Sequence, residues 1–114
     1  MTADGRLSLR SRLLLGILLP VLGVVLINTV SIGNPHCVIL EPLPDDSRLR
    51  RLGSVLEHHA MFPGGTNVEF VHVETPSRVR ILIWERGVGR TQSSGTGSCA
   101  SLVAAAAFGG AAKA

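Results

Sequence analysis

Four short polar clusters interrupt this largely apolar chain of 114 residues, and each carries side chains that could do chemistry. Three of them lie at the ends of β-rich apolar runs, and the fourth opens an apolar helical segment. Their sequences are GNPHC (33–37), TNVEF (66–70), WERG (84–87) and SSGTG (93–97). Polar side chains at strand ends that converge on a helix N-terminus form a small-molecule site. The clusters therefore predict such a site if the fold brings them together.

The cluster at 93–97 favours an anionic ligand. The N–H groups in the first turn of a helix have no intrahelical acceptor, and they attract a carboxylate or a phosphate. Gly95 and Gly97 would let the ligand approach the backbone closely. The alternative is ordinary N-capping by Ser94 or Thr96, which needs no ligand and is worth about 1 kcal/mol. The lysine of a phosphate-binding loop is missing.

Taken singly, the other polar residues also have simpler interpretations. A lone asparagine in a turn, such as Asn34 or Asn67, usually hydrogen-bonds its own backbone. His36 lies between apolar runs, so it is either a hydrogen-bonded core histidine or a catalytic one. Both interpretations remain open at this point.

Composition limits the classes of protein and of site. With 46% hydrophobic and 17% charged residues, the chain can bury a core, and its length allows one domain at most. The net charge is only +3, and the few aromatic residues do not alternate with basic clusters. This argues against a nucleic-acid surface. Two cysteines without CxxC or HxxxH spacing predict neither a disulfide scaffold nor a metal site. They indicate a reducing compartment, and we expect the cytoplasm.

The N-terminal part departs from the rest of the chain. Basic residues precede an uncharged run, Leu13–Ile27, which has the outline of a secretory signal. Pro20 and the short length disfavour a membrane span, although membrane association through this run remains a minor alternative. The other interpretation is two buried strands around a turn at Gly23. We therefore divide the chain into an atypical apolar segment, 1–23, and a domain, 24–114.

Alternating apolar residues predict strands in the remainder of the chain. We expect a turn at Thr75–Ser77 to join the last two of them in a β-hairpin. The GNPHC cluster is expected to interrupt the sheet. The expected strands are Val24–Ile32, Val38–Leu40, Val68–Val73 and Val79–Trp84.

Two helices are expected. The first covers Arg48–His58 and is N-capped by Asp46 or Ser47. Its apolar face is expected to contain Leu49, Leu52, Val55 and Leu56. The second runs from Gly95 to about Phe108, and since it lacks a polar face, it should be buried.

In this order and at these separations, the segments GNPHCVI, FPGGTNVEFV, IWERGVGRT and SSGTGSCAS closely resemble the C-terminal half of the diaminopimelate epimerases. The resemblance runs from residue 24 to residue 107. The related proline racemases and phenazine-biosynthesis isomerases keep the fold but do not keep WERG and TNVEF together. The resemblance implies an α+β fold of two mirrored halves, each a curved, mostly antiparallel sheet around a central buried helix. This chain would form one such half.

The resemblance also implies roles for individual residues. Two asparagines would hold the distal amino acid end of the substrate, an arginine would bind the carboxylate at that end, and the helix start would bind the reacting carboxylate. These substrate-binding residues are Asn34, Asn67, Arg86, Gly95 and Thr96. Polar residues beside the reacting carbon would be catalytic, and they are Ser94, His36 and Glu85.

One departure concerns the reacting group. The family inverts its substrate with two cysteines and no cofactor, and Ser94 stands where the family usually has a cysteine. A serine hydroxyl is a poor base unless a neighbouring group activates it. Cys99, five residues further on, is expected to be a buried small apolar residue.

A second departure is length, since the half that carries the other cysteine is missing. We therefore expect a cofactor-independent isomerase that interconverts LL- and meso-diaminopimelate in lysine biosynthesis, present as a C-terminal fragment that is inactive alone. Its partners would be the small-molecule substrate and either the missing half or a homodimer partner. One alternative is a one-base variant, a dehydratase or a racemase of another amino acid, because of Ser94. Another is a non-catalytic remnant that is bound to a partner or associated with a membrane.

Overall fold

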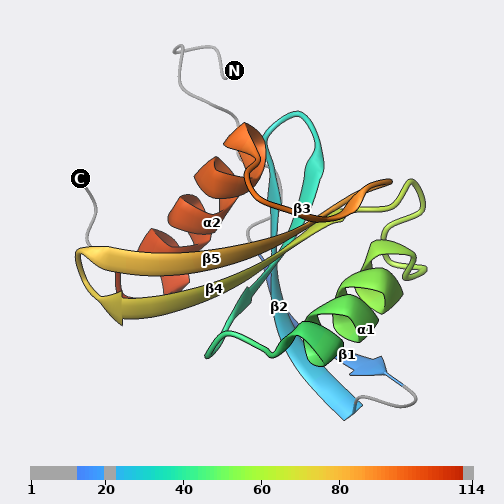
Figure 1. Ribbon diagram of the computed structural model, residues 1–114, viewed down its shortest axis with the longest axis horizontal. Coiled ribbons are helices and arrows are strands. Elements are labelled where there is room, and N and C mark those ends of the chain that lie inside the picture. The colour runs from blue at the N-terminus through green and yellow to red at the C-terminus, as the bar shows by residue number, and fades with distance from the viewer. Residues whose placement is uncertain (1–12, 20–22, 112–114) are drawn as a thin grey trace.

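Six strands form one mixed sheet in the computed structural model, which describes residues 13–19 and 23–111 (Figure 1). The strands lie in chain order, and every neighbouring pair is antiparallel except β3 and β4, which are parallel. The predicted α+β class and mostly antiparallel sheet are confirmed. The elements are β1 (Leu13–Leu19), β2 (Gly23–Ser31), β3 (Pro35–Leu40), α1 (Asp46–Glu57), β4 (Asn67–Thr75), β5 (Arg78–Glu85), β6 (Gly89–Thr91) and α2 (Gly95–Phe108).

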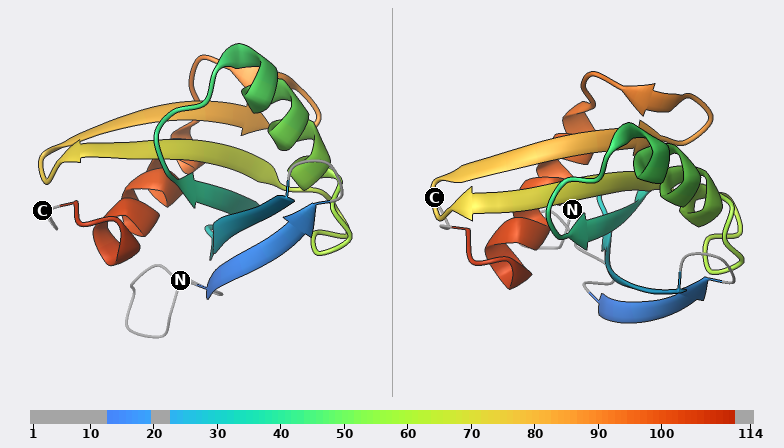
Figure 2. Two further views of the ribbon diagram at one scale, coloured as in Figure 1. Left: turned by 90° about the horizontal axis from the view of Figure 1, so that it is seen from below. Right: turned by 60° about the horizontal axis from the view of Figure 1, so that its bottom comes forward.

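The two helices cover opposite faces of the sheet (Figure 2). Because β3 and β4 are parallel, the chain must cross over between them, and α1 makes that crossover. Both strands are consequently buried on both faces, α1 packing on one and α2 on the other. This explains why the residues from His36 to Ile39 and from Asn67 to Val71 are all buried.

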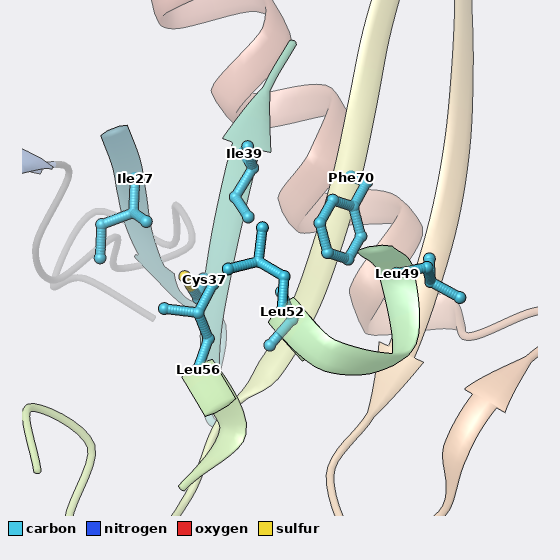
Figure 3. Packing of buried hydrophobic residues seen from close by; sticks show 8 residues of the cluster. Ile27, Cys37, Ile39, Leu49, Leu52, Leu56 and Phe70 are labelled. Atoms are coloured by element: carbon cyan, nitrogen blue, oxygen red, sulfur yellow. The ribbon is translucent and has the colours of Figure 1, made fainter. Parts of the chain in front are cut away.

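Leucines at helical spacing attach α1 to the sheet. Leu49, Leu52 and Leu56 are fully buried and belong to one cluster with Ile39 and Phe70, in which Leu56 lies beside Cys37 (Figure 3). The predicted apolar face is confirmed for these leucines.

Two details of the α1 prediction are wrong. Val55 is 42% exposed, and Gly53 lies on the buried face in its place. The helix is capped by Asp45, one residue before the predicted caps Asp46 and Ser47. Asp45 has an extended backbone, and its carboxylate accepts a hydrogen bond from the Arg48 N–H at 2.8 Å, which is the geometry of an N-cap.

The second helix, α2, has the predicted bounds but not the predicted burial. Ala100, Ala104 and Ala105 are fully buried against the sheet. On its other side Leu102 is 53% exposed and Phe108 is 45% exposed. The predicted burial is therefore confirmed for the side of α2 that packs on the sheet, whereas the opposite side is exposed because the sheet covers only one side of the helix.

The third strand begins earlier than predicted, inside the GNPHC cluster. His36 pairs with Asn67 and Cys37 with Val68 in the parallel register. Pro35 is tolerated because it is the first residue of the strand. Gly33 and Asn34 lie in the connection between β2 and β3, as the predicted interruption requires, whereas the rest of the cluster belongs to β3 and holds His36 in a defined register.

The expected hairpin is confirmed by the antiparallel pairing of β4 with β5. The short strand β6 was not expected. It pairs with the end of β5 after a tight turn in which Gly87 and Gly89 have positive φ angles of 79° and 98°. Such angles favour glycine, and the turn places the WERG cluster at the end of the sheet.

The interpretation of the N-terminal run as two strands is confirmed, since β1 pairs with β2 along its whole length. Leu19 pairs with Gly23, so the connection precedes Gly23, and residues 20–22 lie outside the described residues. No helix in the part of the chain that the structure describes is long and apolar enough to cross a membrane. The division of the chain at residue 23 stays a prediction.

The close packing of α1 on the sheet gives a stability prediction. A Cβ at Gly53 would lie 2.7 Å from the Trp84 ring. We expect Gly53→Ala to lower the free energy of unfolding by about 1–2 kcal/mol, because the steric cost of overpacking outweighs the gain in helix propensity. Urea denaturation measures this change. Ser54→Ala, on the exposed side of the same helix, is the control, and an equal or higher stability of Gly53→Ala would contradict the packing.

Candidate active site

One end of the sheet carries the polar clusters on the face that α2 covers. His36 and Val38 share that face of β3, and Val38 packs against α2. On β4, Asn67 and Glu69 alternate onto the same face as Val71, which also packs against α2. Each of these polar side chains therefore lies on the helix-covered face, close to the point where α2 begins.

Glu85 completes this face at the end of β5. Val68 pairs with Trp84, so Glu85 stands next to Asn67 in the register. Glu85 is half-buried, and its backbone carbonyl accepts the Val88 N–H at 3.0 Å. The structure thus places Glu85 at the same end of the sheet as His36.

Three consecutive hydrogen bonds between side chains join the sheet to the start of α2. Glu69 Oε1 lies 2.8 Å from His36 Nδ1, and His36 Nε2 lies 3.1 Å from Asn34 Oδ1. The Asn34 amide group then donates to Thr96 Oγ1 at 3.4 Å. His36 is thus fully buried and hydrogen-bonded, and it is also linked to the first turn of α2.

The start of α2 leaves backbone donors available. Ser94 is the N-cap, since its Oγ accepts the Gly97 N–H at 3.1 Å. The N–H groups of Gly95 and Thr96 have no intrahelical acceptor. The first turn contains no acidic residue, and apart from its chain neighbours and the backbone of its own helix, nothing lies within 4 Å of where a Gly95 Cβ would be. This arrangement can accept a carboxylate at the positive end of the helix dipole.

Gly97 is required for the close packing beneath this turn. A Cβ at this position would lie 3.0 Å from Glu69 Oε1 and 3.0 Å from Ser94 Oγ. The glycine therefore lets the buried carboxyl of Glu69 approach the helix start.

Asn67 fixes the loop that follows β5. Its Oδ1 accepts the Arg86 backbone N–H at 2.8 Å, and its amide group donates to the Pro35 carbonyl at 3.2 Å. Both partners lie far from Asn67 in the sequence, so the interpretation as a turn residue that bonds its own backbone is wrong, and Asn67 instead joins β4 to the loop after β5 and to the start of β3. One amide hydrogen and one lone pair remain available for a further partner.

Arg86 lies beside a surface hollow of about 220 Å³ at this end of the sheet. Its guanidinium donates to the Gly64 carbonyl at 3.2 Å, and its side-chain stem packs close to Gly65. Pro35 and the loop 61–65 line the rest of the hollow. Arg86 is exposed, so its remaining donors can reach a ligand.

Sequence reasoning missed Glu57, which holds the WERG turn. Its Oε1 accepts the Trp84 indole N–H at 2.8 Å, and its Oε2 accepts the Gly87 N–H at 3.0 Å. Burial alone would raise the pKa of Glu57. The hydrogen bonds from Gly87 and Trp84 outweigh it and, with the nearby charges of His58 and Arg86, hold that pKa below its usual value. The sequence did carry a sign of this role, because Glu57 directly follows the apolar residues that form the buried face of α1.

Glu69 was also missed as a site residue, although it lies within the TNVEF cluster. It is completely buried, and its Oε2 has no hydrogen-bond partner among the described residues. Burial raises the pKa of Glu69 above its usual value, and the hydrogen bond and charge of His36 only partly offset this. The alternation in β4 already predicted that its side chain shares a face with Val71.

Neither cysteine stands at the helix start. Cys37 is buried on the α1 side, where burial and then the charge of Glu69 raise the pKa of its thiol well above the usual range. Cys99 is exposed, so the prediction that it is buried is wrong, because the sheet does not cover that side of α2. No three His, Cys, Asp or Glu side chains within residues 13–19 and 23–111 are placed to hold a metal ion.

The sequence of this chain is similar to a known family and to several curated proteins. Residues 28–114 match the family model described as diaminopimelate epimerase. A diaminopimelate epimerase of Desulforudis audaxviator is 48% identical over 93 residues, which are 75% of this chain and 34% of that protein. The diaminopimelate epimerase of Synechococcus sp. is 49% identical over 82 residues, which are 69% of this chain and 29% of that protein. The diaminopimelate epimerase of Natranaerobius thermophilus is 48% identical over 84 residues, which are 73% of this chain and 28% of that protein. The chain thus spans about a third of the length of these relatives.

The contacts of Glu57 predict a pH-dependent stability. Glu57→Gln should lower the free energy of unfolding by about 2 kcal/mol at pH 7, because two N–H groups lose a charged acceptor. The pKa of Glu57 is lowered on folding, so the wild type should hold this advantage above about pH 4.3 and lose it as the pH falls through the lowered pKa.

Urea denaturation of both proteins from pH 3 to pH 8 measures the difference. Glu74→Gln is the control, because Glu74 makes only exposed ion pairs with Arg78 and Arg80, which are worth at most about 1 kcal/mol. A difference between Glu57→Gln and the wild type that does not change with pH would contradict the assigned role.

Proposed function

The chain belongs to the diaminopimelate epimerase family, and we propose that it supplies one half of a site that interconverts LL- and meso-diaminopimelate. The observation that carries the proposal is the common location of two carboxylate-binding groups. The open first turn of α2 and the guanidinium of Arg86 lie at the same end of the sheet. A diamino diacid has one carboxylate for each of them.

In this proposal the reacting carboxylate binds at the start of α2. The N–H groups of Gly95 and Thr96 would donate to it, and the Thr96 hydroxyl, already held by Asn34, would orient it. The absence of an acidic residue from the first turn leaves the helix dipole to stabilise the anion.

The distal end of the substrate binds toward the hollow beside Arg86. A guanidinium is suited to a carboxylate because its donors are arranged as a planar fork. Asn67 holds the backbone of Arg86 in place and keeps one donor and one acceptor for the distal amino group and carboxylate. Asn34 has the same remaining capacity on the other side of β3.

The reacting carbon would lie between the start of α2 and the side chains of His36 and Glu85. Ser94 occupies the position of the family's cysteine, and its hydroxyl already caps the helix. The hydroxyl is a poor base, so we assign removal of the α-proton to a thiol of the family's other half, and the Ser94 hydroxyl would deliver the replacement proton to the opposite face of the carbon. The reaction then needs no cofactor and belongs to lysine biosynthesis in the cytoplasm.

A second candidate function follows from Ser94. One-base chemistry, such as a dehydration or the racemisation of another amino acid, would require no thiol at this position. The intact WERG and TNVEF clusters favour the original substrate and place this candidate second. A partner-bound, non-catalytic remnant is the third, since Leu102 and Phe108 leave apolar area exposed on α2.

Exchange of the substrate α-proton tests the leading proposal. The chain is mixed with a separately expressed N-terminal half of a related diaminopimelate epimerase and incubated with LL-diaminopimelate in deuterated water. We expect deuterium at the α-carbon with the mixture and none with either part alone. The Arg86→Leu mixture should lose this exchange, because the distal carboxylate has no partner. Absence of exchange in the wild-type mixture contradicts a catalytic role for this half.

Restoring the cysteine separates the first two candidates. In the same mixture, Ser94→Cys should raise the rate of epimerisation at least tenfold, because the thiol pKa of about 8.5 is lowered at a helix N-terminus. Ser98→Cys, one turn further into the helix, is the control. An unchanged rate with Ser94→Cys would favour the one-base variant.

A further inference from the structure

We propose that Glu69 is a positioning residue of this site: its carboxyl shares one proton with His36 Nδ1, so that His36 Nε2 carries a hydrogen and the Asn34 amide is oriented toward the start of α2. The inference deepens the proposed function and rests on it for its catalytic meaning. The protonation pattern itself depends only on the fold.

The orientation of Asn34 determines which histidine nitrogen carries the hydrogen. The amide group of Asn34 donates to Thr96 Oγ1, so its Oδ1 faces His36. An oxygen only accepts, and His36 Nε2 lies 3.1 Å away. Nε2 must therefore be the donor.

The burial of Glu69 determines where the next proton lies. Glu69 Oε2 is buried without a partner, and a full carboxylate charge there would be costly. A proton between Oε1 and Nδ1, which are 2.8 Å apart, removes that charge from the pair. Oε2 is then a carbonyl-type oxygen, which is the least costly group to leave unpaired.

No other group facing Glu69 replaces this proton. Cys37, on the adjacent strand β3, points to the α1 face of the sheet, and burial keeps its thiol protonated. Ser94 Oγ lies near Glu69 at the start of α2 and already accepts the Gly97 N–H. His36 is therefore the only described partner that can share the charge of Glu69.

The consequence for the site is electrostatic. With one shared proton the pair of Glu69 and His36 has no net charge. With an ionised Glu69 and a neutral His36, the pair would carry a negative charge beneath the turn that is proposed to bind a carboxylate, and it would repel that ligand. Glu69 thus keeps the hydrogen on Nε2 while leaving the anion site free of a competing charge.

Nitrogen-15 NMR of the histidine rings in the 114-residue chain tests the proposal. At pH 8 His36, assigned by the loss of its signals in His36→Gln, should show a protonated Nε2. A strongly downfield proton should mark the Nδ1···Oε1 hydrogen bond. A neutral ring with the hydrogen on Nδ1 and an unprotonated Nε2 would overturn the proposal.

Two variants separate positioning from a purely structural role. Glu69→Gln is isosteric with the protonated acid, so we expect it to keep the hydrogen on Nε2 and to lose the downfield shared proton. Glu69→Ala should lose the preference for Nε2. If Glu69→Ala does not fold, the wild type and Glu69→Gln decide the question, and Glu74→Gln, on the same strand, should change nothing at His36.

The outcome is independent of the exchange assay. An active mixture of halves with the hydrogen on Nδ1 would refute the role of Glu69 and leave the proposed function standing. An inactive mixture with the hydrogen on Nε2 would refute the proposed function and leave the role of Glu69 standing. If both hold, Glu69→Gln should alter the pH profile of exchange, because the titrating carboxyl has been removed.

Discussion

The parallel pairing of β3 with β4 is the constraint on which the site depends. Its register sets His36 beside Asn67 and places Glu69 on the same face, toward α2. A parallel pair requires a crossover, and α1 both makes it and ends with Glu57 at the site end of the sheet. A shift of one residue would turn His36 and Glu69 toward the leucines of α1, where neither polar group would find its present partner.

Two buried glutamates hold the site together in opposite ways. Glu57 accepts two N–H groups, which stabilise its charge and fix the WERG turn. Among the described residues Glu69 has only the His36 ring as a hydrogen-bond partner, so burial disfavours its charge and raises its pKa. The stabilising contribution of Glu57 is lost in acid, whereas that of Glu69 is present in acid and declines as the pH rises through its raised pKa. Stability should therefore be greatest between these two limits.

Much of this arrangement could be predicted from the sequence, because alternation and helical spacing report directly on burial. The β4–β5 hairpin, the bounds of α2 and the leucine face of α1 follow from such patterns. The start of β3 at Pro35 could not be predicted in this way, since polar residues of the GNPHC stretch join the sheet only when a partner strand is available. The exposure of Cys99 and Val55, and the contacts of Glu57, depend on which faces the rest of the chain covers. Local sequence does not contain that information.

The most direct measurement of the account is an NMR titration of the nitrogen-15-labelled chain with diaminopimelate. One carboxylate of the ligand is expected at the start of α2 and the other at Arg86. We therefore predict saturable shifts of the Gly95 and Thr96 amides and of the Arg86 side-chain N–H. Lysine, which lacks the second carboxylate, should shift the two amides but not Arg86. Shifts confined to other surfaces, or equal effects of the two ligands at Arg86, would contradict the account.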